Sequence, residues 1–276
     1  MNAKIIVRVA LDRVFTGVIV VLSLMLFVPL FFLLFYVVKN GMAAISWDFF
    51  THLPAPVGET GGGISNAIVG TLMLISIASV LAIPIGIAVG IYLAELRKSR
   101  MASTVRLCVD ILQGIPSIVV GIVAYEWVVK PSGHFSMISG CVALGIMMLP
   151  VVVRTTEETM ILVSHDLKEA AMALGVPYFR TVLKVIVPSG FSGILTGVLL
   201  SVSRIAGETA PLLFTAFGNP FMNMDPLKPV NSMPLMIFNY ATSPYESWQT
   251  EAWGASLVLL VFIFGLNIIA KVVSRR

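Results

Sequence analysis

The chain has 276 residues, of which 58% are hydrophobic and 12% are charged, and its mean hydropathy is +0.97. Soluble domains carry about 25% charged residues, so this composition excludes a soluble globular protein. A net charge of +4 and a pI of about 9.2 would suit a nucleic-acid-binding protein. The placement of the basic residues decides whether they serve that purpose.

Long apolar runs predict an all-α integral membrane protein with six transmembrane helices, built as one domain over residues 1–276. The first run follows Arg8 and Arg13; it is too long for a signal peptide and no small-residue cleavage site follows, so we interpret it as a retained anchor. Pro84, Pro116 and Pro150 fall inside runs, where each permits a kink. The predicted spans are 14–38, 67–94, 107–129, 135–153, 190–217 and 252–273.

The Lys and Arg residues outside these spans sort to two sides. Fourteen lie at the termini and after the second and fourth spans, whereas Lys39, Lys130 and Lys228 lie in the other connections. By the positive-inside rule, both termini and the connection 154–188 are predicted to be cytoplasmic. Membrane topology therefore explains the basic pI, and no nucleic-acid partner is expected.

Small residues recur at every fourth position along the second predicted span and again along the fifth. Such a stripe lets another helix approach closely. That helix belongs either to the same bundle, the interpretation we favour, or to a second membrane subunit. The stripes consist of Ala78, Ala82, Gly86, Gly90 and Ala94, and of Gly193, Gly197 and Ser201.

The cytoplasmic connection predicts two short helices joined by a turn. Asp166 is expected to cap the first helix, with Glu169 completing an approximate capping box. Gly175 suits the left-handed position after that helix, and Pro177 suits the start of the next. We therefore expect a preformed projection on the cytoplasmic surface.

This connection resembles the EAA signature of ATP-binding-cassette (ABC) importer permeases. Val stands at positions 185 and 187, where the signature has Ile and Leu. The resemblance implies the type I ABC importer permease fold and a helix that docks into a groove of an ATPase subunit. In that role Glu169 contacts the ATPase, Ala170 and Ala171 permit close docking, and Gly175 sets the turn. The matching residues are Glu169, Ala170, Ala171, Gly175 and Pro188.

Three further stretches, 113–121, 148–158 and 207–213, resemble permeases of the phosphate-specific (Pst-type) importer. Of its two permease kinds, the A-type subunit is the more similar, judged by 207–215 and 235–253. The resemblance implies import of inorganic phosphate along a pathway shared with a second, C-type permease subunit. It also implies a cytoplasmic ATPase dimer, an extracytoplasmic phosphate-binding protein and a bacterial or archaeal plasma (inner) membrane. The chain has no ATP-binding motif, so we expect no enzyme activity and no cofactor on it, with ATP and Mg on the ATPase.

Arg204 and Glu208 lie inside the fifth predicted span. A charge at the bilayer centre costs about 2.5–3.5 kcal/mol on insertion scales. Their spacing of four predicts an ion pair on one helical face, directed into the bundle. From the residues alone, a packing pair and a substrate pathway are equally supported. The family resemblance favours the pathway. In it, the Arg204 guanidinium offers paired donors to an anion, Glu208 holds that guanidinium in place, and Thr209 also belongs to the pathway.

The other polar residues predict no further site. Asp110 and Glu126 lie near the ends of the third span, where we expect local pairing or snorkelling. The three histidines share no spacing, so no metal site is expected.

Two alternative functions stay open. A permease for molybdate or sulfate would share the EAA segment, and competition among these anions for uptake would separate the cases. An ion-gradient-driven carrier or channel would make the EAA match accidental and would need no ATPase partner.

Overall fold

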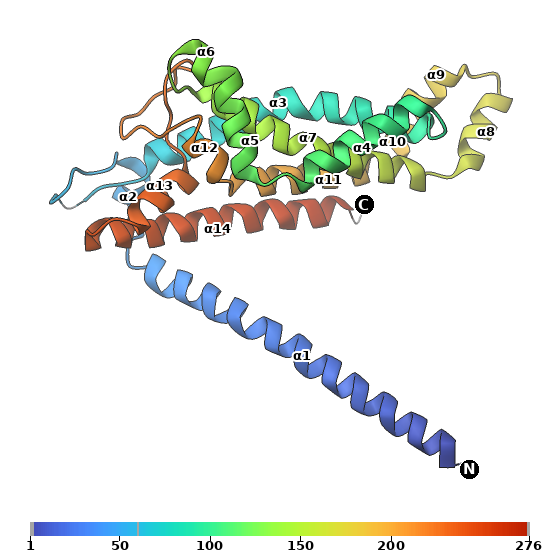
Figure 1. Ribbon diagram of the computed structural model, residues 1–276, viewed down its shortest axis with the longest axis horizontal. Coiled ribbons are helices and arrows are strands. Elements are labelled where there is room, and N and C mark those ends of the chain that lie inside the picture. Colours follow the sequence, from blue (N-terminus) through green and yellow to red (C-terminus); the bar gives the residue numbers. More distant parts are fainter. Residues whose placement is uncertain (1–2, 60, 275–276) are drawn as a thin grey trace.

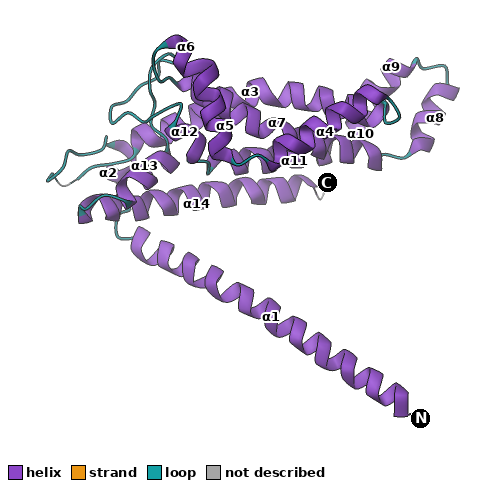
Figure 2. Cartoon of the chain, viewed as in Figure 1, coloured by secondary structure: helices purple, strands orange, loops and turns teal. Residues whose placement is uncertain are grey.

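The computed structural model describes residues 3–59 and 61–274. These residues form helices joined by loops, and Phe217 and Val230 form an isolated bridge, so the all-α prediction is confirmed (Figures 1 and 2). In chain order the helices are α1 (Ala3–Gly41), α2 (Trp47–Thr51), α3 (Ser65–Glu95), α4 (Arg100–Gly114), α5 (Ser117–Ala124), η1 (Tyr125–Val129), α6 (Lys130–Ser132), α7 (Met137–Leu162), α8 (His165–Ala173), α9 (Tyr178–Thr181), η2 (Val182–Ile186), α10 (Val187–Ser189), α11 (Phe191–Ala206), α12 (Ala210–Leu213), α13 (Met233–Ala241) and α14 (Glu246–Ser274).

Four helices are long and apolar enough to cross a membrane: α1, α3, α7 and α14. Two bent helix pairs bring the number to six if each pair forms one span. Their segments are Arg100–Gly114 with Ser117–Ser132, bent by 105°, and Tyr178–Ser189 with Phe191–Ala206, bent by 66°. The structure therefore has four to six candidate spans, and the regions predicted as the third and fifth spans are not continuous helices.

Proline and glycine explain where those two spans break. Pro116 has no amide hydrogen and disfavours helix at the residue before it, so α4 ends at Gly114 and α5 begins at Ser117. The 66° bend lies at Gly190, between α10, which contains Pro188, and α11. A further interruption follows at the other end of α11, which ends at Ala206 with Gly207 as its C-cap, and Pro211 lies in the first turn of α12. A hydropathy run does not reveal such breaks, because the residues on both sides are apolar.

The helix that contains the fourth predicted span extends beyond the end of that span. The helix α7 continues to Leu162 rather than ending at position 153, so the first part of the predicted cytoplasmic connection is helical. No Gly or Pro interrupts residues 151–162. Charged side chains there pair with residues of α4, as described below, and this pairing removes the polarity penalty that suggested a helix end.

The core forms where α7 packs between α3 and α11, and the small-residue stripes provide the close approach. A Cβ atom added to Gly86 would lie 2.7 Å from Cγ1 of Val152, and one added to Gly90 would lie 2.5 Å from Cβ of Thr156. On α11, Gly197 leaves room for Thr155 of α7. The stripes therefore serve packing within this chain, as the favoured interpretation predicted.

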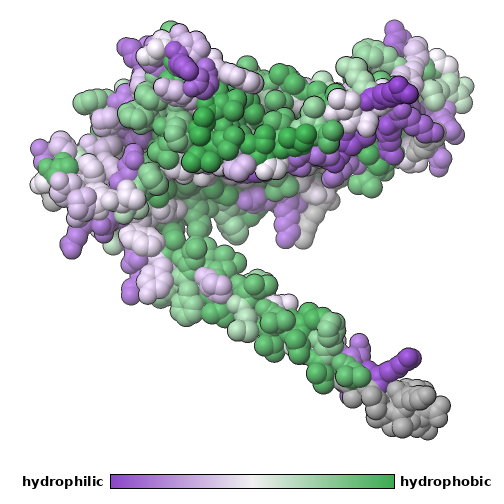
Figure 3. All heavy atoms as spheres, viewed as in Figure 1, coloured by the Kyte–Doolittle hydropathy of each residue, from purple (hydrophilic) through white to green (hydrophobic). Residues whose placement is uncertain are grey.

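The helix α1 diverges from the bundle and meets it at its C-terminal end, where Gly41 packs against Trp253 and Leu257 of α14 (Figure 1). Apolar side chains cover α1 and the middle of the bundle, and hydrophilic residues gather towards both ends (Figure 3). In Figure 1, α1 begins and α14 ends towards the side of the molecule that carries α8 and α9.

Candidate functional site

The N-cap of α8 lies two residues earlier in the sequence than predicted. Ser164 is its N-cap, and the Ser164 hydroxyl accepts a hydrogen bond from the Asp166 amide at 3.3 Å. Asp166 therefore lies in the first turn, where a carboxylate favours the positive end of the helix dipole, rather than at the cap. The prediction of an Asp166 capping box is wrong, because a serine two residues earlier takes that role.

The end of α8 is a Schellman motif centred on Gly175. The Gly175 amide donates to the carbonyl of Met172 at 2.9 Å, and the Val176 amide donates to that of Ala171 at 3.2 Å. Gly175 has a φ of +79°, a left-handed conformation that glycine adopts without strain. Pro177 then caps α9, so the predicted helix, turn and helix are confirmed. We call residues 164–189 the α8–α9 hairpin.

The residues of the EAA signature lie on two sides of α8. Glu169 and Ala170 are exposed on the outer side of the hairpin, whereas Ala171 is 9% exposed and faces inward. The outer side can therefore meet another protein through Glu169 and Ala170. Ala171 instead lets α8 pack closely on η2 and α9, against which it lies.

Pro188 is exposed and lies in α10, directly after the π-helical segment η2. The segment η1 likewise precedes Pro131. A proline inside a helix has no amide hydrogen, and its ring clashes with the carbonyl four residues earlier. A wider π-helical turn relieves that clash without ending the helix. Pro188 thus shapes the path from the hairpin into α11.

Arg204 and Glu208 form a loose ion pair where α11 ends. Nε of Arg204 lies 3.9 Å from Oε1 of Glu208, and the two side chains are 50% and 20% exposed. Arg204 occupies the last turn of α11, where the helix dipole favours a cation. The pair exists as predicted, but Arg204 is not directed into the interior of this chain, because half of its side chain is exposed. We call these two residues the α11 pair.

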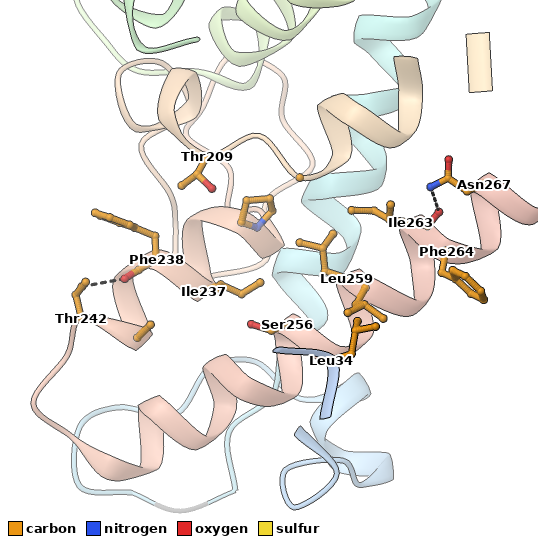
Figure 4. A pocket seen from close by; sticks show the side chains of 14 residues that line it. Leu34, Thr209, Ile237, Phe238, Thr242, Ser256, Leu259, Ile263, Phe264 and Asn267 are labelled. Carbon is orange, nitrogen blue, oxygen red and sulfur yellow. Dashed lines mark hydrogen bonds between the residues drawn. The ribbon is translucent and has the colours of Figure 1, made fainter. Parts of the chain in front are cut away.

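Thr209 lies in the short connection after α11 and faces a separate cavity of about 720 Å³ between α13 and α14 (Figure 4). The cavity is lined mainly by apolar side chains and includes Leu34 of α1. Its Thr242 and Asn267 side chains donate to carbonyls of their own helices, as Figure 4 shows. None of the residues lining it is charged, so it offers no counter-charge to an anion. Arg204 and Glu208 are not among them.

The stretches 113–121 and 207–213 meet in space. A Cβ atom added to Gly121 of α5 would lie 2.7 Å from Cα of Pro211 of α12, so the two backbones touch. Each stretch contains an interruption of helix, at Pro116 between α4 and α5 and at Gly207 after α11. The fold therefore brings two interrupted helices together beside the α11 pair.

A second charged cluster, between α4 and α7, was not predicted from the sequence. Glu157 of α7 is 3% exposed and accepts hydrogen bonds from Arg106 at 2.6 Å and 2.9 Å and from Arg154 at 3.0 Å. Arg154 also pairs with Asp110 at 2.8 Å, so Asp110 is paired, but with a residue of another helix rather than a local one. We call these four residues the α4–α7 network. The spacing of four between Arg106 and Asp110 indicates that both charges lie on one face of α4. It does not predict the network, because their partners lie in another helix.

The other sequence expectations concern local chemistry. Glu126 pairs with Lys130 at 2.6 Å, as expected for an acid near a helix end. Within residues 3–59 and 61–274, no group of three or more His, Cys, Asp or Glu side chains is placed to hold a metal ion.

Residues 86–276 match the family described as "Binding-protein-dependent transport system inner membrane component". The chain is 44% identical over 248 residues to the phosphate transport system permease protein PstA of Yersinia pestis, an alignment that spans 90% of this chain and 84% of that one. It is 35% identical over 261 residues to a probable PstA of Methanocaldococcus jannaschii, spanning 94% and 92% of the two chains.

Two solved structures share the fold. An inward-facing structure of the MetNI methionine ABC transporter matches with a TM-score of 0.66 and 18% identity, covering 77% of this chain and 94% of that chain. An amino acid ABC transporter with histidines matches with a TM-score of 0.56 and 17% identity, covering 77% and 93%.

Proposed function

The chain belongs to the family of binding-protein-dependent transport system inner membrane components, and from this premise we propose that it is the permease subunit of an ATP-driven importer of inorganic phosphate. It is a multi-pass membrane protein with the type I ABC importer permease fold. The choice of phosphate is supported by the identity of 35–44% to PstA permeases along most of the chain. The bacterial or archaeal plasma (inner) membrane, with the α8–α9 hairpin in the cytoplasm, is part of the proposal.

The observation that carries the proposal is the exposed, preformed α8–α9 hairpin. Its capped helix presents Glu169 and Ala170 outward, and Gly175 closes it in a left-handed turn. A rigid projection loses little entropy on docking. In the proposed importer it docks into a cytoplasmic ATPase dimer, which binds ATP and Mg, while an extracytoplasmic phosphate-binding protein delivers the anion. This chain itself then needs no cofactor, and residues 1–276 act as one permease domain with residues 154–188 as its coupling segment.

The α11 pair supports the proposed substrate route. Interrupted backbone at membrane depth is tolerated where it is covered by protein or lines a water-filled cavity. Arg204 is half exposed beside such an interruption, and its contact with lipid would cost about 2.5–3.5 kcal/mol. We therefore assign its exposed face to a pathway shared with a second, C-type permease subunit. There the guanidinium offers paired donors to phosphate, Glu208 orients it, and Thr209 lies next to them.

The proposal is tested by expressing the chain with its partner subunits and reconstituting the purified complex in vesicles. We expect an ATPase to co-purify, and we expect ATP-dependent uptake of labelled phosphate that excess molybdate or sulfate does not suppress. Strong competition by either anion would favour the alternative substrate. Uptake that follows an ion gradient and needs no ATPase would overturn the proposal.

The same preparation tests the hairpin. Gly175→Val should remove ATP-dependent uptake because a Cβ atom at φ +79° strains the turn, although nothing lies within 4 Å of that position. Glu169→Lys should do so by reversing a charge on the docking side. Gly265→Val is the control, because its Cβ atom also meets nothing within 4 Å but the backbone there is helical. Normal uptake by both hairpin variants would contradict the docking assignment.

A further inference from the structure

The helix α3 ends at Glu95, a carboxylate at the end of the helix where a negative charge is unfavourable. Glu95 is the last residue of α3, and no basic residue lies in that last turn. The negative end of the helix dipole repels an anion. Arg97 and Lys98 follow directly in the sequence but are exposed, whereas Glu95 pairs with Lys168 of α8, 73 positions away. The compensating charge therefore comes from the α8–α9 hairpin.

Three groups come together at this point. The Lys168 ammonium donates to Glu95 and, at 3.2 Å, to the hydroxyl of Tyr178, whose ring centre lies 4.6 Å away. The Tyr178 hydroxyl donates to the same carboxylate. The side chains of Lys168 and Glu95 are 18% and 13% exposed, so water screens their attraction weakly. We call Glu95, Lys168 and Tyr178 the α3–α8 joint.

Lys168 stays protonated at physiological pH, so its ion pair with Glu95 persists there. Burial lowers the pKa of Lys168, but hydrogen bonds with Glu95 and Tyr178 raise it by more, so the pKa lies above its ordinary value. Lys168 therefore carries its charge throughout the physiological pH range, and its contribution to the pair is lost as the pH rises through that raised pKa.

The joint bridges a space that side chains do not fill. A cavity of about 520 Å³ lies between the ends of α3, α7 and α8, and its lining includes Glu95, Lys168, Met160 and Ile186. The helix α8 packs on α9 and η2, the other parts of its own hairpin. The segment η2 in turn belongs to an apolar cluster with Ile87, Ile91 and Ala94 of α3. The polar joint adds a direct link between the side chains of α8 and α3 to this packing.

We infer that the α3–α8 joint makes α3 follow the hairpin when a docked ATPase moves α8, so that Lys168 and Glu95 are positioning residues for transport. This inference rests on the proposed function. The helix α3 packs along α7 through Gly86 and Gly90, and α7 packs on α11 through Thr155. A displacement of Glu95 is therefore transmitted through the closely packed helices α3 and α7 to α11, which carries Arg204.

The test measures phosphate imported per ATP hydrolysed by the whole complex in vesicles, together with the amount of ATPase that co-purifies. Lys168→Met keeps the apolar stem and removes the charge, and Glu95→Gln removes its partner. Each should leave ATPase binding and ATP hydrolysis in place but lower the phosphate-to-ATP ratio by about tenfold or more. Tyr178→Phe keeps the ring and should have a smaller effect. Lys98→Met, an exposed lysine at the same cavity, should match the unmodified complex.

A charge swap distinguishes the joint from a merely structural lysine. Glu95→Lys combined with Lys168→Glu restores an opposite pair and should bring the ratio back to within about threefold of the unmodified complex. A normal ratio in Lys168→Met with ATPase bound would overturn the joint while leaving the proposed function intact. Loss of the ATPase from Lys168→Met without rescue by the swap would make Lys168 a docking or folding residue and would also overturn the joint. Failure of the unmodified chain to bind an ATPase would overturn both.

Discussion

The α4–α7 network and the α11 pair both hold arginine and carboxylate side chains, and they differ in how far this chain satisfies them. In the network, Glu157 is 3% exposed and accepts hydrogen bonds of 2.6–3.0 Å from two arginines. In the α11 pair, the charges lie 3.9 Å apart and Arg204 is 50% exposed. The network is complete within one chain, whereas the pair keeps donors available for something outside it.

Burial gives this difference its physical meaning. A buried carboxylate is tolerated when hydrogen bonds and opposite charges replace its water, so the network stabilises the packing of α4 on α7. An arginine that is half exposed and lies 3.9 Å from its carboxylate partner is held loosely and can exchange its contacts. The comparison supports a structural role for Glu157, and it is consistent with the proposed contact between Arg204 and substrate.

The largest effect is expected from Glu157→Gln. Removing the carboxylate leaves Arg106 and Arg154 facing each other, which should destabilise the fold by about 3 kcal/mol. We expect little assembled complex, measured by co-purification and size-exclusion chromatography, and uptake lost in proportion. Glu158→Gln is the matched control, because Glu158 is the neighbouring acid and is exposed. If Glu157→Gln assembled normally, the network would not be structural.

Arg204→Gln should separate transport from assembly. It keeps most of the volume but removes the charge, so phosphate uptake should fall by about thirtyfold or more while the yield of complex is unchanged. Arg204→Lys should restore uptake poorly, because an ammonium lacks the planar pair of donors. Full activity with lysine would show that charge alone suffices.

The double variant Arg204→Leu with Glu208→Leu sharpens the contrast further. A packing pair could be replaced by two apolar residues without harm, since no charge would remain unpaired. A pathway pair could not, so we expect assembled complex without phosphate uptake. Substantial transport by the double-leucine protein would refute the role of Arg204 in the pathway.

The smallest effect is expected from Asp110→Asn at the rim of the network. Asp110 is 44% exposed, and its partner Arg154 keeps the bond to Glu157. Exposed ion pairs contribute about 0–1 kcal/mol, so the thermal midpoint and the uptake rate should change little. A loss as large as that of Glu157→Gln would show that Asp110 supports the fold as strongly as Glu157 does.

The sequence predicted the α8–α9 hairpin better than any other element, because its determinants are local. Gly175 and Pro177 have backbone preferences that act within a few residues. The cap was assigned to Asp166 instead of Ser164, because both residue types cap helices and the choice depends on where the preceding helix α7 ends. The outer face of Glu169 and the inner face of Ala171 depended on the packing of α8 against α9.

By itself the sequence determined the membrane class, the approximate positions of six spans and the spacing of the EAA residues, since hydropathy and backbone preference are properties of short stretches. Only the tertiary structure decided where spans three and five break, and that Glu157 belongs to Arg106 and Glu95 to Lys168, across 51 and 73 positions. The same is true of Arg204, whose charge was visible in the sequence but whose exposure was not. Charge pairing and burial depend on which helices become neighbours, and close packing of α3, α7 and α11 settles that only when the whole bundle forms.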